Sequence, residues 1–483
     1  IMASASAPSA SASTSSPQSE TGITVTTSTE FTVYPASETA NTLVGINMTG
    51  CAAPSDTDRA PVDVVVVADV SGSMAGSKMT LLKDTLRLLL GDLVAKDRVG
   101  LVTFDSYVKE PFPLQTLTSQ AKSTAEGVVD KLRAGSATNL SGGLFQGIQQ
   151  LINQSGDAKN SKKEEGAPRC RTVLLMTDGQ ANNGLKTSAE IVPIVTNMLK
   201  DTGIGLHTFG YGSDHDSGLL RDIAAAGSGS YYFVEGVDDI RGAFGDCLGG
   251  LLSVVAQNLE LTVAAAGGAS ITKVHHNNAV AAGPGCWKLK YSDLYGEEQR
   301  DLLVSVALPK SSVDGAMDVL SSSLSYIDVL AGTPEVVRNT VAVQRSTKEI
   351  SSQDQNRDAR LELQSTRLQV AETLTSARAA AEKGDLKSAR ALVSKTRGEV
   401  SAVSARCASV EGAEAMLPTF MMDLAECEDG LTDQRTFYSK QHKMTMLAEG
   451  HMQQRCMESA SVSLGGGGGS ALRSNAYRTK AKK

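Results

Sequence analysis

The feature that most constrains this chain is a buried strand that runs directly into a turn rich in oxygen-bearing side chains. Residues 64–67 are four consecutive valines, and such an unbroken apolar run is typical of a central parallel strand covered on both faces. Asp69, Ser71 and Ser73 follow at intervals of two residues. Because this turn leaves the carboxyl end of the strand, the three side chains can point at one place. Hard oxygen donors suit Mg²⁺ or Mn²⁺.

Two later stretches place further oxygen donors where the same site would lie. Thr138 lies in a loop that precedes an apolar segment at 140–152, which we predict to be a helix. Residues 172–177 repeat the first pattern, since this apolar run ends in Asp178 and a glycine. In an open α/β sheet, ligands bind in the crevice outside the carboxyl ends of the strands. We therefore expect these side chains to converge at one edge of a sheet.

Together these residues resemble the von Willebrand factor A domains that carry a metal-ion-dependent adhesion site. The family pattern is Asp-x-Ser-x-Ser followed by a separate Thr and a separate Asp, and it is matched by Asp69, Ser71, Ser73, Thr138 and Asp178. The resemblance implies that the hydroxyls contact Mg²⁺, Mn²⁺ or Ca²⁺ directly or through water, and that the aspartates hold and charge-balance the shell. It also implies that an Asp or Glu carboxylate of a partner protein completes the shell.

The bulk composition excludes some classes of function. At 483 residues the chain is long enough for about three domains. A net charge of -7 argues against a general nucleic-acid binder, and no apolar run approaches the length of a membrane span. The seven cysteines are odd in number and contain no Cys-x-x-Cys pair, which favours reduced thiols. We therefore expect an intracellular, cytoplasmic protein.

The expected fold is a doubly wound, Rossmann-like α/β domain inserted in a β-sandwich and followed by a C-terminal helical hairpin or bundle. Strand-like segments lie on both sides of the α/β unit, and those before it lack a core of their own. The predicted segments are a disordered Ser/Ala leader (1–20), N-terminal sandwich strands (21–60), the α/β domain (61–257), the remaining sandwich strands (258–345), a helical module (346–458) and a flexible Gly-rich basic tail (459–483). The sequence leaves open whether a further domain precedes Ile1.

Individual elements follow from the hydrophobic pattern. Residues 79–93 are amphipathic and predict a helix, whereas the Lys-, Glu-, Gly- and Ser-rich segment at 153–169 predicts a mobile surface loop. In the C-terminal module, two long helices would meet at Gly384, with further helices at 413–427 and 433–457. Their apolar faces are expected to form a core before they form a docking surface.

Two other patterns imitate catalytic sites. Asp214, His215 and Asp216 follow a predicted strand, and imidazole beside carboxylate can perform acid-base chemistry, but aspartate is also a common helix N-cap. Cys247 lies in a Gly-Asp-Cys-Leu-Gly sequence like a nucleophile elbow, yet it falls inside an apolar stretch at 240–255 that predicts a helix. We expect Cys247 to be a packed thiol, and we expect the chain not to be an enzyme.

The stretches at 212–216 and 243–257 sharpen the resemblance, because they look like the plant zinc-finger and A-domain proteins that act as RING-type ubiquitin ligases. The resemblance implies an A domain followed by β-structure and a helical module, which is also found beside A domains in Hint-containing proteins. A RING needs a dense series of Cys and His residues around two zinc ions, and this sequence contains no such series. Ligase activity is therefore not carried over.

The function that we predict is divalent-cation-dependent binding of a protein partner through an acidic residue of that partner. One alternative is the substrate-recruiting portion of a RING-type ubiquitin ligase that lacks its own RING. The other is a structural component of a larger assembly, in which the helical module makes the contacts. The sequence leaves open the partner, the choice of metal and the oligomeric state.

Overall fold

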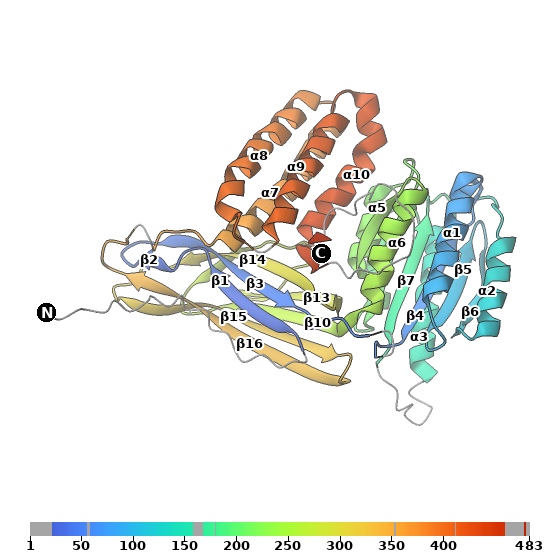
Figure 1. Cartoon of the computed structure of the whole chain (residues 1–483), viewed down its shortest axis with the longest axis horizontal. Helices are drawn as coiled ribbons and strands as arrows, with labels where there is room; N and C mark the ends of the chain where they lie inside the picture. The colour runs from blue at the N-terminus through green and yellow to red at the C-terminus, as the bar shows by residue number, and fades with distance from the viewer. Residues whose placement is uncertain are drawn as a thin grey trace.

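The computed structural model describes residues 22–55, 58–157, 168–178, 180–351, 354–410, 412–458 and 478–479. The predicted leader at 1–20 lies outside the described residues, as does the predicted tail at 459–483 apart from residues 478–479. Figure 1 shows a body of β-sheets around the N-terminal strands, an α/β part beside it, and a set of helices packed against both.

The α/β part is built on a sheet whose strand order is β6-β5-β4-β7-β8-β9. Its neighbouring strands are parallel except for β6, which pairs antiparallel with β5 at one edge. The strands are β4 (Val62–Asp69), β5 (Arg98–Phe104), β6 (Val108–Thr116), β7 (Cys170–Thr177), β8 (Ile204–Tyr211) and β9 (Ser228–Val234). The four valines of β4 are fully buried between β5 and β7, as a central parallel strand requires.

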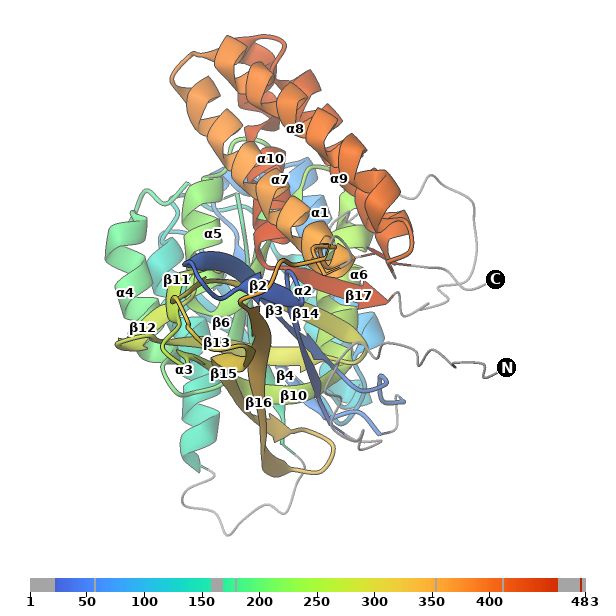
Figure 2. The same ribbon diagram turned by 90° about the vertical axis from the view of Figure 1, so that its left-hand side faces the viewer.

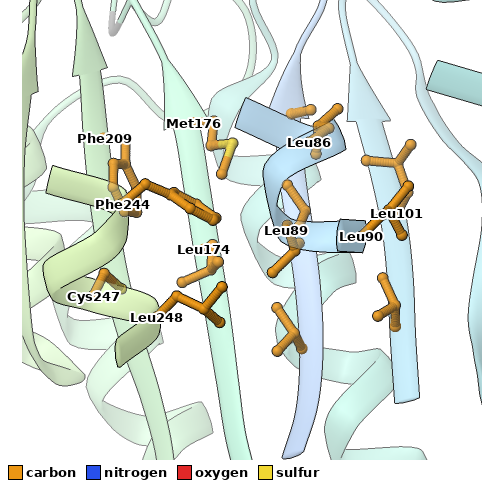
Figure 3. Close-up of a cluster of buried hydrophobic side chains, with 14 of the residues drawn as sticks. Leu86, Leu89, Leu90, Leu101, Leu174, Met176, Phe209, Phe244, Cys247 and Leu248 are labelled. Carbon is orange, nitrogen blue, oxygen red and sulfur yellow. The ribbon is translucent and has the colours of Figure 1, made fainter. Parts of the chain in front are cut away.

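Helices cover both faces of this sheet. Val64 and Val66 point into one hydrophobic cluster, and Val65 and Val67 point into another on the opposite face. The first face carries α1 (Ser77–Asp92), α2 (Ser119–Lys131) and α6 (Val237–Leu252), and the second carries α3 (Leu140–Asp157), α4 (Ser188–Leu199) and α5 (Ser217–Ala226). Figure 3 shows side chains of α6, Cys247 among them, beside those of β7, and side chains of α1 on the side of β5. Cys247 is thus a buried thiol of the core, as predicted.

Two further sheets share one hydrophobic cluster, which joins Ile46 and Leu302 of one sheet to Leu261 and Leu324 of the other. The first sheet contains β1 (Thr24–Thr29), β3 (Ala40–Thr49), β11 (Ser270–Val274), β14 (Glu298–Leu308), β17 (Arg455–Glu458) and β18 (Arg478–Thr479). The second contains β2 (Val33–Pro35), β10 (Val254–Ala265), β12 (Val280–Gly283), β13 (Cys286–Tyr295), β15 (Gly315–Asp328) and β16 (Thr333–Ser346). The chain passes from β3 into the α/β sheet and returns through β10.

The C-terminal module packs long helices around an apolar core that includes Val370, Val393, Phe420 and Phe437. Its helices are α7 (Ala359–Glu382), α8 (Leu386–Cys407), α9 (Ala413–Gly430) and α10 (Gln434–Met452). Gly384 turns the chain between α7 and α8 with a φ of 83°, a left-handed conformation that favours glycine. In Figures 1 and 2, α10 lies on the side of the module that faces the α/β part.

Several predicted element boundaries were wrong. The expected surface loop at 153–169 begins later, because α3 continues to Asp157, and residues 158–167 lie outside the described part. The helix expected at 240–255 ends at Leu252, and β10 begins at Val254. The helix expected at 433–457 ends at Met452 because the chain then pairs with β14 as β17, and residues 478–479 of the expected flexible tail pair with β17. Backbone pairing with a distant strand leaves no periodic trace in the local sequence.

Within the described part of the chain, no helix combines the length and the apolarity that crossing a bilayer requires.

Candidate metal centre

The predicted ligands come from loops at one end of the parallel sheet. Asp69 ends β4, and Asp178 follows β7, which pairs with β4 in parallel. Backbone hydrogen bonds of 2.6 and 2.8 Å join the loop at 70–72 to the loop at 135–136, which precedes Thr138. The loops that carry the five predicted residues therefore lie at the carboxyl ends of the central strands, where the ligands of such sheets bind.

Four of these residues form a continuous hydrogen-bonded group. Asp69 Oδ1 accepts a hydrogen bond from the Ser71 amide at 2.7 Å. The hydroxyls of Ser71 and Ser73 lie 3.0 Å apart, and the Ser73 hydroxyl donates to Asp178 Oδ1 at 2.9 Å. Asp69, Ser71 and Asp178 are buried, whereas Ser73 is exposed. The oxygens of this group can thus be reached from solvent at Ser73.

Thr138 is held through its backbone by the segment that follows β7. Its amide donates to Asn182 Oδ1 at 2.8 Å, and its carbonyl oxygen accepts from the amides of Asn182 and Asn183 at 3.2 and 3.1 Å. The Thr138 side chain is buried. The segment after β7 therefore fixes the position of this threonine, although the two lie far apart in sequence.

Asp69 is electrostatically unusual. Burial raises the pKa of Asp69 to about 6, and nearby Asp178 adds to this effect, while hydrogen bonds from Ser71 and Thr177 oppose it. Thr177 donates from its hydroxyl to Asp69 Oδ2 at 2.6 Å. The carboxylates of Asp69 and Asp178 repel each other when both are ionised, so the binding of a cation beside them would be favoured.

Lys78, in the first turn of α1, supplies a positive charge at the edge of the group. Its ammonium nitrogen lies 3.0 Å from Asp178 Oδ2 and 2.8 and 3.0 Å from the two carboxylate oxygens of Asp214. Burial acts to lower the pKa of Lys78, but its hydrogen bonds to Asp214 and Asp178 outweigh this effect and the pKa is raised. One ammonium therefore bridges a buried carboxylate and a half-exposed one.

The donor set fits a hard divalent cation. Hydroxyl and carboxylate oxygens are the ligands that Mg²⁺ and Mn²⁺ prefer, and the carboxylate charge of Asp69 and Asp178 would balance a dication. In the ranges that the structure describes, no group of three or more His, Cys, Asp or Glu residues is arranged to hold a metal ion. Any ion here would thus depend on Ser71, Ser73 and Thr138, and their role as ligands stays a prediction.

The Asp214, His215 and Asp216 sequence has structural contacts at every position. Asp216 accepts a hydrogen bond from the amide of Leu219 and so caps α5. The ring nitrogens of His215 lie 2.6 Å from the Gly212 carbonyl oxygen and 2.6 Å from the Tyr231 hydroxyl. Burial, together with nearby His442, lowers the pKa of His215 to about 4. Asp216 thus fills the N-cap role, which the sequence left open beside acid-base chemistry.

Sequence reasoning missed three residues that shape the site. Lys78, Thr177 and Asn182 contact Asp178, Asp69 and Thr138 respectively. Lys78 carried a usable signal, because it lies five positions after Ser73 at the start of a predicted helix. Thr177 and Asn182 carried none, since a Thr inside a buried strand and an Asn in a loop are both common.

The profile of the von Willebrand factor type A domain matches residues 63–245. E3 ubiquitin-protein ligase WAV3 of Arabidopsis thaliana is 30% identical over 307 residues, which cover 60% of this chain and 37% of that protein. Inter-alpha-trypsin inhibitor heavy chain H1 of Mesocricetus auratus is 31% identical over 178 residues, which cover 37% of this chain and 19% of that protein. The chain thus spans well under half the length of these two relatives.

A solved structure described as von Willebrand factor type A from Catenulispora acidiphila is similar in fold, with a TM-score of 0.63 at 16% identity. The likeness covers 81% of this chain and 88% of that one, and therefore extends beyond residues 63–245. These comparisons confirm the predicted fold class in its α/β fold, its mixed sheets and its C-terminal helices. The chain therefore contains a von Willebrand factor type A domain at residues 63–245.

Proposed function

We propose that this chain is a non-enzymatic module that binds a protein partner through a divalent cation. Type A domains commonly mediate protein-protein interaction, and the hydrogen-bonded oxygens of Asp69, Ser71, Ser73 and Asp178 are the observation that carries the proposal. With Thr138 they would hold Mg²⁺ or Mn²⁺, and the exposed position of Ser73 leaves the ion open to a partner. The ion would supply a positive charge for a carboxylate of an Asp or Glu on that partner.

The lack of a catalytic role is part of the same proposal. Asp216 and His215 are already engaged by the backbone of α5, by Gly212 and by Tyr231, and Cys247 is buried in the core. A hydrolase would need a nucleophile, a base and an orienting group together. The predicted cytoplasmic setting stays a prediction.

Metal binding is the first test. Mn²⁺ would be titrated by calorimetry into the wild-type chain and into Ser71→Ala, Thr138→Val and Asp178→Ala, with Ser123→Ala on the exposed face of α2 as control. Each ligand substitution is expected to weaken Mn²⁺ binding by at least about tenfold, and Ser123→Ala should leave it unchanged. Equal Mn²⁺ binding by all the variants would contradict the proposed site.

Partner recognition is the second test. Synthetic peptides that each carry one Asp or Glu would be compared with matched Asn or Gln peptides on the immobilised chain, in Mn²⁺ and in chelator. Retention of the acidic peptides only, and only in Mn²⁺, is expected because a carboxylate adds a charged oxygen ligand to the ion. If the chain binds Mn²⁺ but retains acidic and amide peptides equally, the ion has a structural role instead.

A second candidate is recruitment of substrates for a ubiquitin ligase. The likeness to the ligase WAV3 extends over 307 residues, well beyond the type A domain itself. This candidate would be favoured if a partner bound at the cation site became ubiquitinated, by an added ligase, only when the chain with intact Asp178 was present. It would be rejected if the ubiquitination of that partner ignored the Asp178→Ala substitution.

A further inference from the structure

Lys78 places a protein-derived positive charge on one of the predicted ligands. Its ammonium nitrogen lies 3.0 Å from Asp178 Oδ2, while the other oxygen of Asp178 accepts from Ser73. We propose that the Lys78 ammonium neutralises Asp178 when no divalent ion is bound, and that it competes with the ion for that carboxylate. Asp214 is the second partner of the ammonium and offsets part of this competition. This inference rests on the proposed function and concerns the regulation of the same site.

The need for such a cation follows from the burial of Asp178. Its side chain is 1% exposed and lies near the buried carboxyl group of Asp69. An ionised carboxylate in such a place is costly unless an opposite charge pairs with it. The ammonium of Lys78, whose side chain is 18% exposed, is that opposite charge in the structure.

The fold provides a second place for the same ammonium. Asp214 faces Lys78 with both carboxylate oxygens, at 2.8 and 3.0 Å, and is itself 58% exposed. Gly212 makes room for the pair, since a Cβ atom there would lie 2.8 Å from Lys78 Cε and 2.9 Å from Asp214 Oδ1. The ammonium can therefore leave Asp178 without losing a charged partner.

The competition follows from elementary electrostatics. A dication held by Ser73 and Asp178 would lie close to the ammonium, and like charges at that distance repel each other. The divalent ion and the Lys78 ammonium would also both bind the carboxylate of Asp178. Lys78 should thus lower the affinity of the site for divalent ions, and Asp214 should offset part of that effect by holding the ammonium.

The experiment is a double-mutant cycle on Mn²⁺ affinity, measured by calorimetry on the full chain. Lys78→Met is expected to bind Mn²⁺ about fivefold or more tightly than wild type, because a repelling charge is removed. Asp214→Asn is expected to bind about threefold or more weakly, because Lys78 then has only Asp178. The double variant should match Lys78→Met, because Asp214 acts through Lys78.

Lys83→Met is the matched control, since Lys83 lies on the same helix and its ammonium donates to the carbonyl oxygen of Asp130. It changes the net charge equally and should leave Mn²⁺ affinity nearly unchanged. Lys78→Met binding no more tightly than Lys83→Met would overturn the inference. An Asp214→Asn effect that persists fully in the Lys78→Met background would also overturn it, since Asp214 would then act on the ion directly.

Thermal unfolding in chelator separates this inference from the proposed function. Without metal, Lys78→Met should melt at a lower temperature than wild type, and the added substitution Asp178→Asn should restore the loss by removing the unpaired charge. A Lys78→Met chain that melts like wild type in chelator would overturn the inference whether or not Mn²⁺ binds. If only the wild type fails to bind Mn²⁺, the proposed function is contradicted. If both the wild type and Lys78→Met fail to bind Mn²⁺, the proposed competition is overturned as well.

Discussion

Buried carboxylates around the central strand each depend on a residue that lies far away in the sequence. Asp69 accepts a hydrogen bond from Thr177, and Asp63 accepts from Arg98 and Arg169. Asp97, before β5, accepts from both terminal nitrogens of Arg59 at 2.9 and 2.7 Å. A single such residue can therefore decide the stability of the sheet, because removing one partner leaves the other charge buried and unpaired.

We predict that Asp97→Ala lowers the free energy of unfolding by about 3–5 kcal/mol at pH 7, because it leaves the buried Arg59 guanidinium unpaired. Asp84→Ala is the control, since its pair with Arg87 is exposed and should contribute less than about 1 kcal/mol. Urea unfolding measures both values. Equal losses in the two variants would contradict the prediction.

The same pair gives a defined pH dependence. Burial acts to raise the pKa of Asp97, but the Arg59 guanidinium and two backbone amides outweigh it and hold the pKa below its ordinary value. The stabilisation is therefore complete above the pKa of the unfolded chain, about 3.9, and is lost as the pH falls through the lower folded pKa. The difference in free energy of unfolding between wild type and Asp97→Ala should stay constant from pH 7 to pH 5 and become smaller only at more acidic pH.

At the scale of elements, the approach of α3 to the central strand is set by one glycine. A Cβ atom at Gly147 would lie 2.2 Å from Val67 Cγ2 of β4, so the helix can lie this close only without a side chain there. Thr138 lies just before the start of α3. Displacement of this helix would thus reach the candidate metal centre through the backbone.

We predict that Gly147→Ala lowers the free energy of unfolding by about 1–3 kcal/mol and weakens Mn²⁺ binding, because the helix must move away from β4. Gly127→Ala in α2 is the matched control, since a Cβ atom there would meet nothing within 4 Å. That change should stabilise the chain by about 0.5–1 kcal/mol. Urea unfolding and Mn²⁺ titration test both expectations, and a stabilising Gly147→Ala would show that the packing is looser than described.

At the scale of the whole molecule, α10 joins the helical module to the α/β domain. The ring of His442 on α10 stacks on His215 with centroids 4.5 Å apart. Farther along, Gln453 contacts the carbonyl oxygen of Gly229 at the start of β9, and the chain then enters the β14 sheet as β17. The loop that carries His215 also carries Asp214, so the helical module packs on the segment that holds Lys78.

We predict that this contact weakens at acidic pH. Burial lowers the pKa of His215, to about 4, and that of His442, so both rings are neutral in the folded chain at pH 7. Since the unfolded chain takes up these protons near pH 6.5, the stabilisation is complete above that value and is lost as the pH falls toward 4. The charged and titratable groups facing the two rings are Lys78, Asp214, Asp216, Tyr231 and Arg378.

Urea unfolding at pH 7 and pH 5 tests this prediction. Replacing His442 by Leu should reduce the loss of free energy of unfolding between the two pH values, because one ring that must stay neutral is removed. Tyr438→Leu, an exposed position on the same helix, should leave the loss unchanged. An unaltered pH dependence in the His442 variant would place the acid-sensitive groups elsewhere.

The sequence by itself determined the parallel sheet and the end of the sheet at which Asp69 and Asp178 lie. The unbroken valines of β4 and the apolar run of β7 require burial on both faces, and the residues that follow such strands must lie at one edge of the sheet. The N-cap role of Asp216 and the burial of Cys247 followed in the same way, because helix caps and apolar stripes are local signals.

Tertiary structure alone decided which distant groups meet. The position of Lys78 between Asp178 and Asp214, the stack of His442 on His215, and the pairing of β17 with β14 each join segments that lie far apart in the chain. Local pattern carries no information about such contacts, because a Lys at a helix start or a His on a helix is compatible with many surroundings. Their energies depend on burial and distance, which exist only once the chain has folded.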